Sequence, residues 1–135
     1  LNNNHQFYKI LKKNLMKNFK ELNVWKQGIE IVKMTYQLSK LFPQEEKFSI
    51  TSQINRAAVS IPANIAEGSS RNSDKDYARF LQIALGSAFE LQTYLIIIRE
   101  FKWTPEEKLS KLEELIELEI KMIQAFIKQL LIIRK

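Results

Sequence analysis

The sequence predicts an all-α protein, an antiparallel four-helix bundle with up-down-up-down topology. Three observations lead to this prediction. Glycine and proline contribute only 3 residues each to the 135-residue chain, too few for the frequent turns of a sandwich or barrel. Apolar residues recur at spacings of three and four over long segments, as they do on one face of a helix. The connections between these segments are short, so consecutive helices are expected to be antiparallel neighbours.

The first two helices are expected over residues 23–42 and 49–67. Pro43 should end the first helix, because the residue before a proline is disfavoured in the helical conformation. Gly68 should stop the second helix. Pro62 lies inside the second helix and should kink it, since proline removes one backbone hydrogen bond.

The third and fourth helices begin with recognisable caps. Ser73 is followed three residues later by an aspartate, a capping pattern that opens a helix over residues 73–101. The fourth helix is expected over residues 104–134, with Thr104 as its cap and Pro105 in the first helical position.

Small side chains are frequent in the second and third helices. Such residues allow two helix axes to approach closely, and we assign Gly86 to this close packing rather than to a ligand site. The small residues are Ala57, Ala58, Ser60, Ala63, Ala66, Ala84, Gly86, Ser87 and Ala88.

The fourth helix has an unusually wide apolar arc of about 160° at 100° per residue. A surface helix needs about 100° for its own core, so the surplus predicts contact with another subunit. The alternative is a helix that sits deeper in its own bundle. The arc contains Leu112, Leu115, Ile116, Ile120, Met122, Ile123, Phe126, Ile127, Leu130 and Ile133.

Residues 1–15 differ from the rest of the chain. They contain three lysines and no acidic residue, and a more regular pattern begins at Met16. We interpret residues 1–15 as an upstream or cloning-derived extension, with a short native helix as the alternative. The bundle domain is then expected over residues 16–135.

Several kinds of chemistry are excluded by composition. The chain has no cysteine, and His5 is its single histidine, so zinc sites, thiol catalysis and the Glu-x-x-His pairs of di-iron bundles are not expected. No phosphate-binding loop or nucleophile motif occurs. We therefore predict no enzymatic activity, catalytic residue, metal or cofactor. The longest uncharged runs, such as residues 57–66, are too short to span a bilayer, and the protein is expected in the cytoplasm without a membrane partner.

Three glutamates lie among or beside apolar positions. An unpaired buried carboxylate costs several kcal/mol, so we expect these acids to form structural ion pairs, with ligand contact as the alternative. The acids are Glu67, Glu90 and Glu119, and their candidate partners are Arg56, Arg79 and Arg99.

One segment carries a specific motif, RAAVSIPANIAEG at residues 56–68. Together with flanking motifs it resembles the four-helix-bundle family named for the 23S ribosomal RNA intervening sequences, over about residues 19–95. The flanking motifs are Val24-Trp25, Phe42-Pro43, Gln53-Ile54, Tyr77-x-Arg79-Phe80-Leu81 and Gly86-Ser87.

The resemblance implies a bacterial-type bundle that assembles as a ring, commonly a pentamer, with no known enzymatic activity. It also implies kinship with the accessory variability proteins of diversity-generating retroelements, which form a basic pentameric barrel that engages nucleic acid and a reverse transcriptase. Binding of RNA or DNA is the expectation that follows.

Charge placement supports this expectation independently. In an up-down bundle, the end that holds the turn between the second and third helices gathers more basic than acidic residues, which favours phosphate binding. The nucleic-acid-binding residues predicted there are Arg71, Lys75, Arg79, Lys20 and Lys26. The alternative for Arg79 is an ion pair with Glu67 or Asp76. The alternative function is a protein-binding scaffold or adaptor that does not bind nucleic acid.

Overall fold

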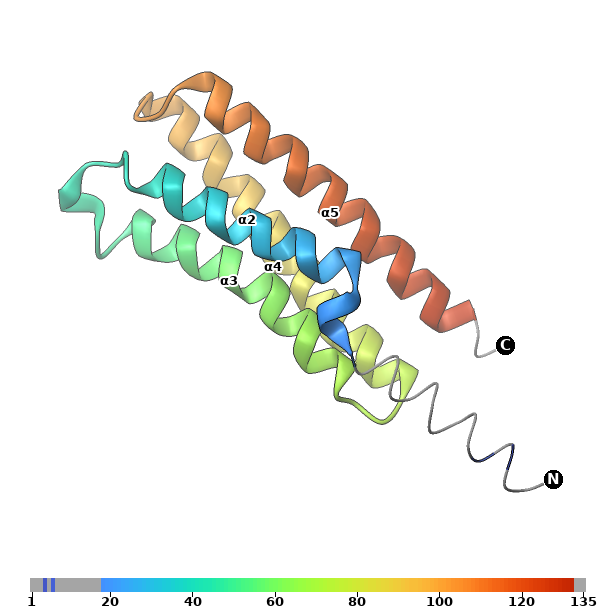
Figure 1. Cartoon of the computed structure of the whole chain (residues 1–135). Helices are drawn as coiled ribbons and strands as arrows, with labels where there is room; N and C mark the ends of the chain where they lie inside the picture. Colours follow the sequence, from blue (N-terminus) through green and yellow to red (C-terminus); the bar gives the residue numbers. More distant parts are fainter. Residues whose placement is uncertain (1–3, 5, 7–17, 133–135) are drawn as a thin grey trace.

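The computed structural model describes residues 4, 6 and 18–132, and these residues form four helices and no strands. Each helix packs antiparallel against its neighbours, with α2 and α4 each contacting both α3 and α5 (Figure 1). The predicted all-α, up-down-up-down bundle is therefore confirmed. The helices are α2 (Asn23–Ser39), α3 (Ile50–Ser69), α4 (Asp74–Phe101) and α5 (Glu106–Ile132), with short 3₁₀ turns η1 (Phe19–Glu21) and η2 (Gln44–Glu46). Apart from Asn4 and Gln6, the proposed extension lies outside the described residues.

Helix α2 ends at Ser39, before the predicted end at Phe42. The amides of Leu41 and Phe42 donate to the carbonyls of Leu38 and Ser39, three residues back, so the chain tightens into turns there. The connection of residues 40–49 is consequently longer than predicted.

Helix α3 runs through both Pro62 and Gly68 and ends at Ser69. Gly68 is not the predicted left-handed stop, because no described glycine has a positive φ. Its role is close packing on α4, since a Cβ at this position would lie 2.9 Å from both Cβ of Phe80 and Cδ1 of Tyr77.

The two predicted helix caps have different outcomes. The hydroxyl of Ser73 accepts a 3.0 Å hydrogen bond from the Asp76 amide, which confirms the cap of α4. The Thr104 cap is wrong: its hydroxyl is buried without a partner among the described residues. The carbonyl of Pro105 instead accepts the first helical bond, from the Leu109 amide, so α5 begins one residue later than expected.

Small residues do bring α3 and α4 together. Ala58 and Ala84 are fully buried, and the hydroxyls of Ser60 and Ser87 lie 2.7 Å apart across the contact. Gly86 does not contribute to this packing, because it is exposed and a Cβ there would meet no atom within 4 Å. Gly86 lies outside the buried stripe of α4, which contains Leu81, Ala84, Ala88 and Leu91.

The apolar arc of α5 packs mainly against its own bundle, which agrees with the alternative prediction of a helix that sits deeper in the bundle. Helix α5 lies between α2 and α4, and its central residues Leu112, Ile116 and Ile123 are buried there. Among the described helices, the largest group of exposed large apolar side chains is on α4. It comprises Ile83, Phe89, Ile96, Ile97 and Phe101.

By length and composition alone, α4 would be able to cross a membrane, and 39% of its most apolar window is buried in the bundle. The sequence criterion of uncharged runs missed this property because scattered charged residues interrupt a long apolar helix. A core helix of a soluble protein passes the same test, so the finding does not establish a membrane span.

Candidate nucleic-acid interface

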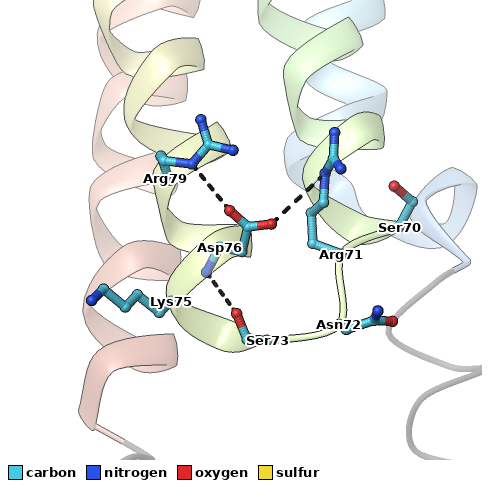
Figure 2. Close-up of a pocket in the computed structure, with 7 residues that line it drawn as sticks. All are labelled: Ser70, Arg71, Asn72, Ser73, Lys75, Asp76 and Arg79. Atoms are coloured by element: carbon cyan, nitrogen blue, oxygen red, sulfur yellow. Dashed lines mark hydrogen bonds and ion pairs between the residues drawn. The ribbon is translucent and has the colours of Figure 1, made fainter.

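The short turn between α3 and α4 gathers three of the predicted cations. Arg71 lies in the turn, and Lys75 and Arg79 lie on the first turns of α4. All three line one open hollow of about 630 Å³ (Figure 2). Its other lining residues are Ser70, Asn72, Ser73 and Asp76.

Asp76 lies between the two arginines of the hollow (Figure 2). Its Oδ1 is 3.0 Å from Nε of Arg79, and its Oδ2 is 4.0 Å from Nε of Arg71. Arg71 also pairs with Glu67, with 3.0 Å between Nη2 and Oε1. The alternative prediction that Arg79 pairs with Asp76 is therefore confirmed. The side chains of Arg71 and Arg79 are 37% and 61% exposed, so both keep partial access to an anion.

The ring of Phe80 holds the two guanidinium groups near each other. Cζ of Arg71 lies 4.4 Å and Cζ of Arg79 lies 4.6 Å from the centroid of this ring. Both distances are within the range of a cation–π contact. The contacts restrict where the two positive charges can lie at the rim of the hollow.

Lys75 is the cation of the hollow with the greatest freedom. It is exposed, forms no ion pair within the described residues, and points away from the Asp76 network in Figure 2. It also lies in the first turn of α4, where the helix N-terminus adds a modest positive potential.

Lys20 and Lys26 do not share the hollow with the other three predicted residues. Both are exposed, on η1 and α2, but neither lines the hollow beside Arg71. The structure thus brings together three of the five predicted residues. Three further basic residues, Lys17, Arg134 and Lys135, lie outside the described residues.

Glu119 has the environment least expected from the sequence. It is 0% exposed, and neither carboxylate oxygen has a hydrogen-bond partner in the described part of the chain. It lies beside Gly28 of α2, where a Cβ would be 3.0 Å from Oε2 of Glu119 and 3.2 Å from Cβ of Pro62. Burial raises the pKa of Glu119 to about 8.

The prediction of an ion pair for Glu119 is therefore wrong. Among the candidate partners, Arg79 binds Asp76, and Arg99 binds Glu106 and Glu113 from α5. Arg56 is exposed and has no ion pair among the residues that the structure describes.

The other two acids have partners close in sequence. Glu67 pairs with Arg71, which was not a predicted candidate. Glu90 accepts a 2.9 Å hydrogen bond from the hydroxyl of Tyr94. Within the described residues, no three histidine, cysteine or acidic side chains gather as a metal site.

Sequence reasoning missed a second cationic hollow, beside Tyr36 and Lys47 at the other end of α3. The available signal was Phe48, an aromatic residue outside every predicted apolar stripe. It lies in the connection that was expected to be shorter.

The fold and the cationic turn define an all-α four-helix bundle with a basic end. The family model of the 23S rRNA-intervening sequence protein matches residues 20–125, and the chain belongs to this family. A crystal structure of a protein with unknown function, from the S23 ribosomal protein family of Bacteroides thetaiotaomicron VPI-5482, is similar in fold. Its sequence identity is 27% and its TM-score is 0.72, over 78% of this chain and 98% of that chain. No curated protein matches the sequence.

Proposed function

We propose that this chain is a non-enzymatic, oligomeric cytoplasmic protein that binds RNA or DNA through the basic end of its bundle. The observation that supports this best is the hollow lined by Arg71, Lys75 and Arg79, in which Asp76 is the single acidic lining residue. Cations placed along a phosphate backbone supply affinity that falls with salt. Kinship with the accessory variability proteins is part of the same proposal.

Assembly would repeat this hollow around a ring. The exposed face of α4, which carries Ile83, Phe89, Ile96, Ile97 and Phe101, supports assembly because apolar surface of this kind is favourable to bury against another subunit. By resemblance to its family we propose a pentamer. A ring would multiply the positive potential of each basic end.

Replacing Arg71 and Lys75 together by glutamine is expected to weaken binding of duplex RNA. Two fewer phosphate contacts should reduce the slope of log affinity against log salt by up to about two. Fluorescence anisotropy with a labelled RNA duplex over a salt series measures both quantities.

The matched control is the double variant Lys111→Gln and Lys121→Gln, which removes the same charge from exposed positions on α5. An equal loss in the control would mean that net charge alone drives binding. Unchanged affinity and slope in the Arg71 and Lys75 variant would exclude the hollow and favour the protein scaffold.

The double variant Phe89→Lys and Ile96→Lys is expected to dissociate the oligomer, because it places two charges on the exposed face of α4 where apolar surface would be buried. Light scattering should then give a lower mass than for the wild type. Leu118→Lys is the control, since Leu118 is 50% exposed on α5 and outside this face. A wild type that is monomeric at micromolar concentration would contradict the proposal.

A further inference from the structure

We propose that a second surface, at the end of α3 opposite the α3–α4 turn, binds single-stranded nucleic acid by stacking its bases on exposed aromatic rings. The proposal shares only its class of ligand with the proposed function, because it involves other residues and another binding mode. Figure 1 shows the α2–α3 connection and the α3–α4 turn at opposite ends of the bundle. The aromatic surface, as we call it, comprises Tyr36, Lys40, Lys47, Phe48 and Arg56.

Phe48 is the strongest single indication of a binding surface here. Its side chain is 91% exposed, the largest value among the exposed hydrophobic residues of the described chain. The ammonium of Lys47 lies 5.6 Å from its ring centroid. Tyr36 of α2, 44% exposed, lines the same hollow of about 560 Å³. Two accessible rings with a cation beside one of them provide stacking faces for bases.

The charge of the surface fits a polyanion. This hollow adjoins a second one of about 380 Å³, since Tyr36, Lys47, Thr51 and Asn55 line both. Their combined lining includes three cations, Lys40, Lys47 and Arg56, and no acidic residue.

The nearest acid in sequence is engaged locally. Glu46 accepts a hydrogen bond from the hydroxyl of Ser49 and lines neither hollow. The side chain of Ser49 makes no capping bond at the start of α3. The first-turn amides of α3 are therefore not occupied by that cap, and such amides favour phosphate.

A polar side chain completes the surface. Oδ1 of Asn55 accepts a 3.0 Å hydrogen bond from the hydroxyl of Ser39. This bond fixes the orientation of the amide group, and its nitrogen remains a donor for a base edge or a phosphate.

Single-stranded nucleic acid fits these features better than a duplex or a protein. A duplex hides the faces of its bases, so it would not use the rings of Phe48 and Tyr36. The core of a protein interface is depleted of charged residues, whereas this surface has three cations without an acid. Single strands are bound by this combination of cations and stacking rings.

The test compares Phe48→Leu and Phe48→Trp in binding a labelled single-stranded RNA and the same strand in a duplex. Phe48→Leu is expected to weaken single-strand binding about fivefold or more and to leave duplex binding unchanged, while Phe48→Trp keeps both. Lys47→Gln should lower the single-strand salt slope by about 0.7. Leu118→Ala is the control, because Leu118 is an exposed apolar residue of α5 that lines neither hollow and lies outside the exposed face of α4.

Unchanged single-strand binding by Phe48→Leu overturns this proposal. If that variant also has a lower oligomer mass while RNA binding is intact, the ring of Phe48 is a contact between subunits instead. The outcomes that exclude the proposed function differ from those that exclude this second surface. If Phe48→Leu lowers single-strand binding and the Arg71 and Lys75 variant changes nothing, only the basic hollow is excluded. If the wild type binds neither RNA, both proposals are excluded.

Discussion

Replacing Glu119 by glutamine is expected to stabilise the bundle at neutral and alkaline pH and to abolish most of its pH dependence between about pH 4.5 and 8. The reason is that a fully buried carboxyl without a partner is disfavoured in its charged form. Its pKa rises from 4.5 to about 8 on folding. Between these values the native state retains a proton that the unfolded chain has lost.

The sign follows from this difference in proton binding. The contribution of Glu119 to stability is expected to be greatest below pH 4.5, to fall by about 1.4 kcal/mol per pH unit as pH rises towards 8, and then to level off. The loss at pH 7 is about 3 kcal/mol. Glu119→Gln stays neutral throughout and should avoid this loss.

Urea unfolding at pH 5, 7 and 9 measures the effect. Glu117→Gln is the matched control, because Glu117 is exposed on the same helix and should change stability little at any of these values. Wild-type stability that is constant across the range would show that Glu119 has a charge-stabilising partner in solution.

The case of Glu119 shows what periodicity can and cannot predict. Its place within the apolar arc of α5 follows from the sequence, because 100° per residue fixes the face of a helix on which a side chain lies. Its lack of a partner among the described residues does not follow from the sequence. That depends on α2, which brings Gly28 rather than an arginine beside its carboxylate.

The residues of the basic end could also be predicted only in part from the sequence. Arg71, Lys75 and Arg79 meet because the α3–α4 turn is short and two of them are one helical turn apart on α4. Lys20 and Lys26 share that end by topology alone, which does not specify that their side chains reach the same hollow. The aromatic surface was not predicted, because it depends on a connection with no periodic pattern.

The roles predicted for Gly68 and Gly86 were both wrong. Gly68 precedes a run of polar residues, which is typical of a helix stop, and Gly86 lies among small residues, which is typical of close packing. In the structure Gly68 packs against α4 and Gly86 faces open space. Local composition alone does not reveal whether a glycine lies on the buried or the exposed side of its helix.

Alanine substitutions at these two glycines are therefore expected to have opposite effects. Gly68→Ala should destabilise the bundle by about 1–2 kcal/mol, because overpacking in a core costs about 1–3 kcal/mol and the gain in helix propensity returns up to about 1 kcal/mol. The new methyl group would meet the buried Tyr77 and Cβ of Phe80, which is tied closely to the α4 backbone. Gly86→Ala meets no atom and should stabilise α4 by about 0.5–1 kcal/mol.

Urea unfolding of both variants at several protein concentrations tests the pair, with the wild type as reference. Equal destabilisation by both substitutions at a concentration where the protein is monomeric would contradict the close packing assigned to Gly68 and the open position assigned to Gly86. Gly86 also lies on the exposed face of α4, within one turn of Ile83 and Phe89. If Gly86→Ala stabilises the monomer and weakens assembly, a neighbouring subunit must pack closely over this glycine, because only an added partner can make a methyl group there unfavourable.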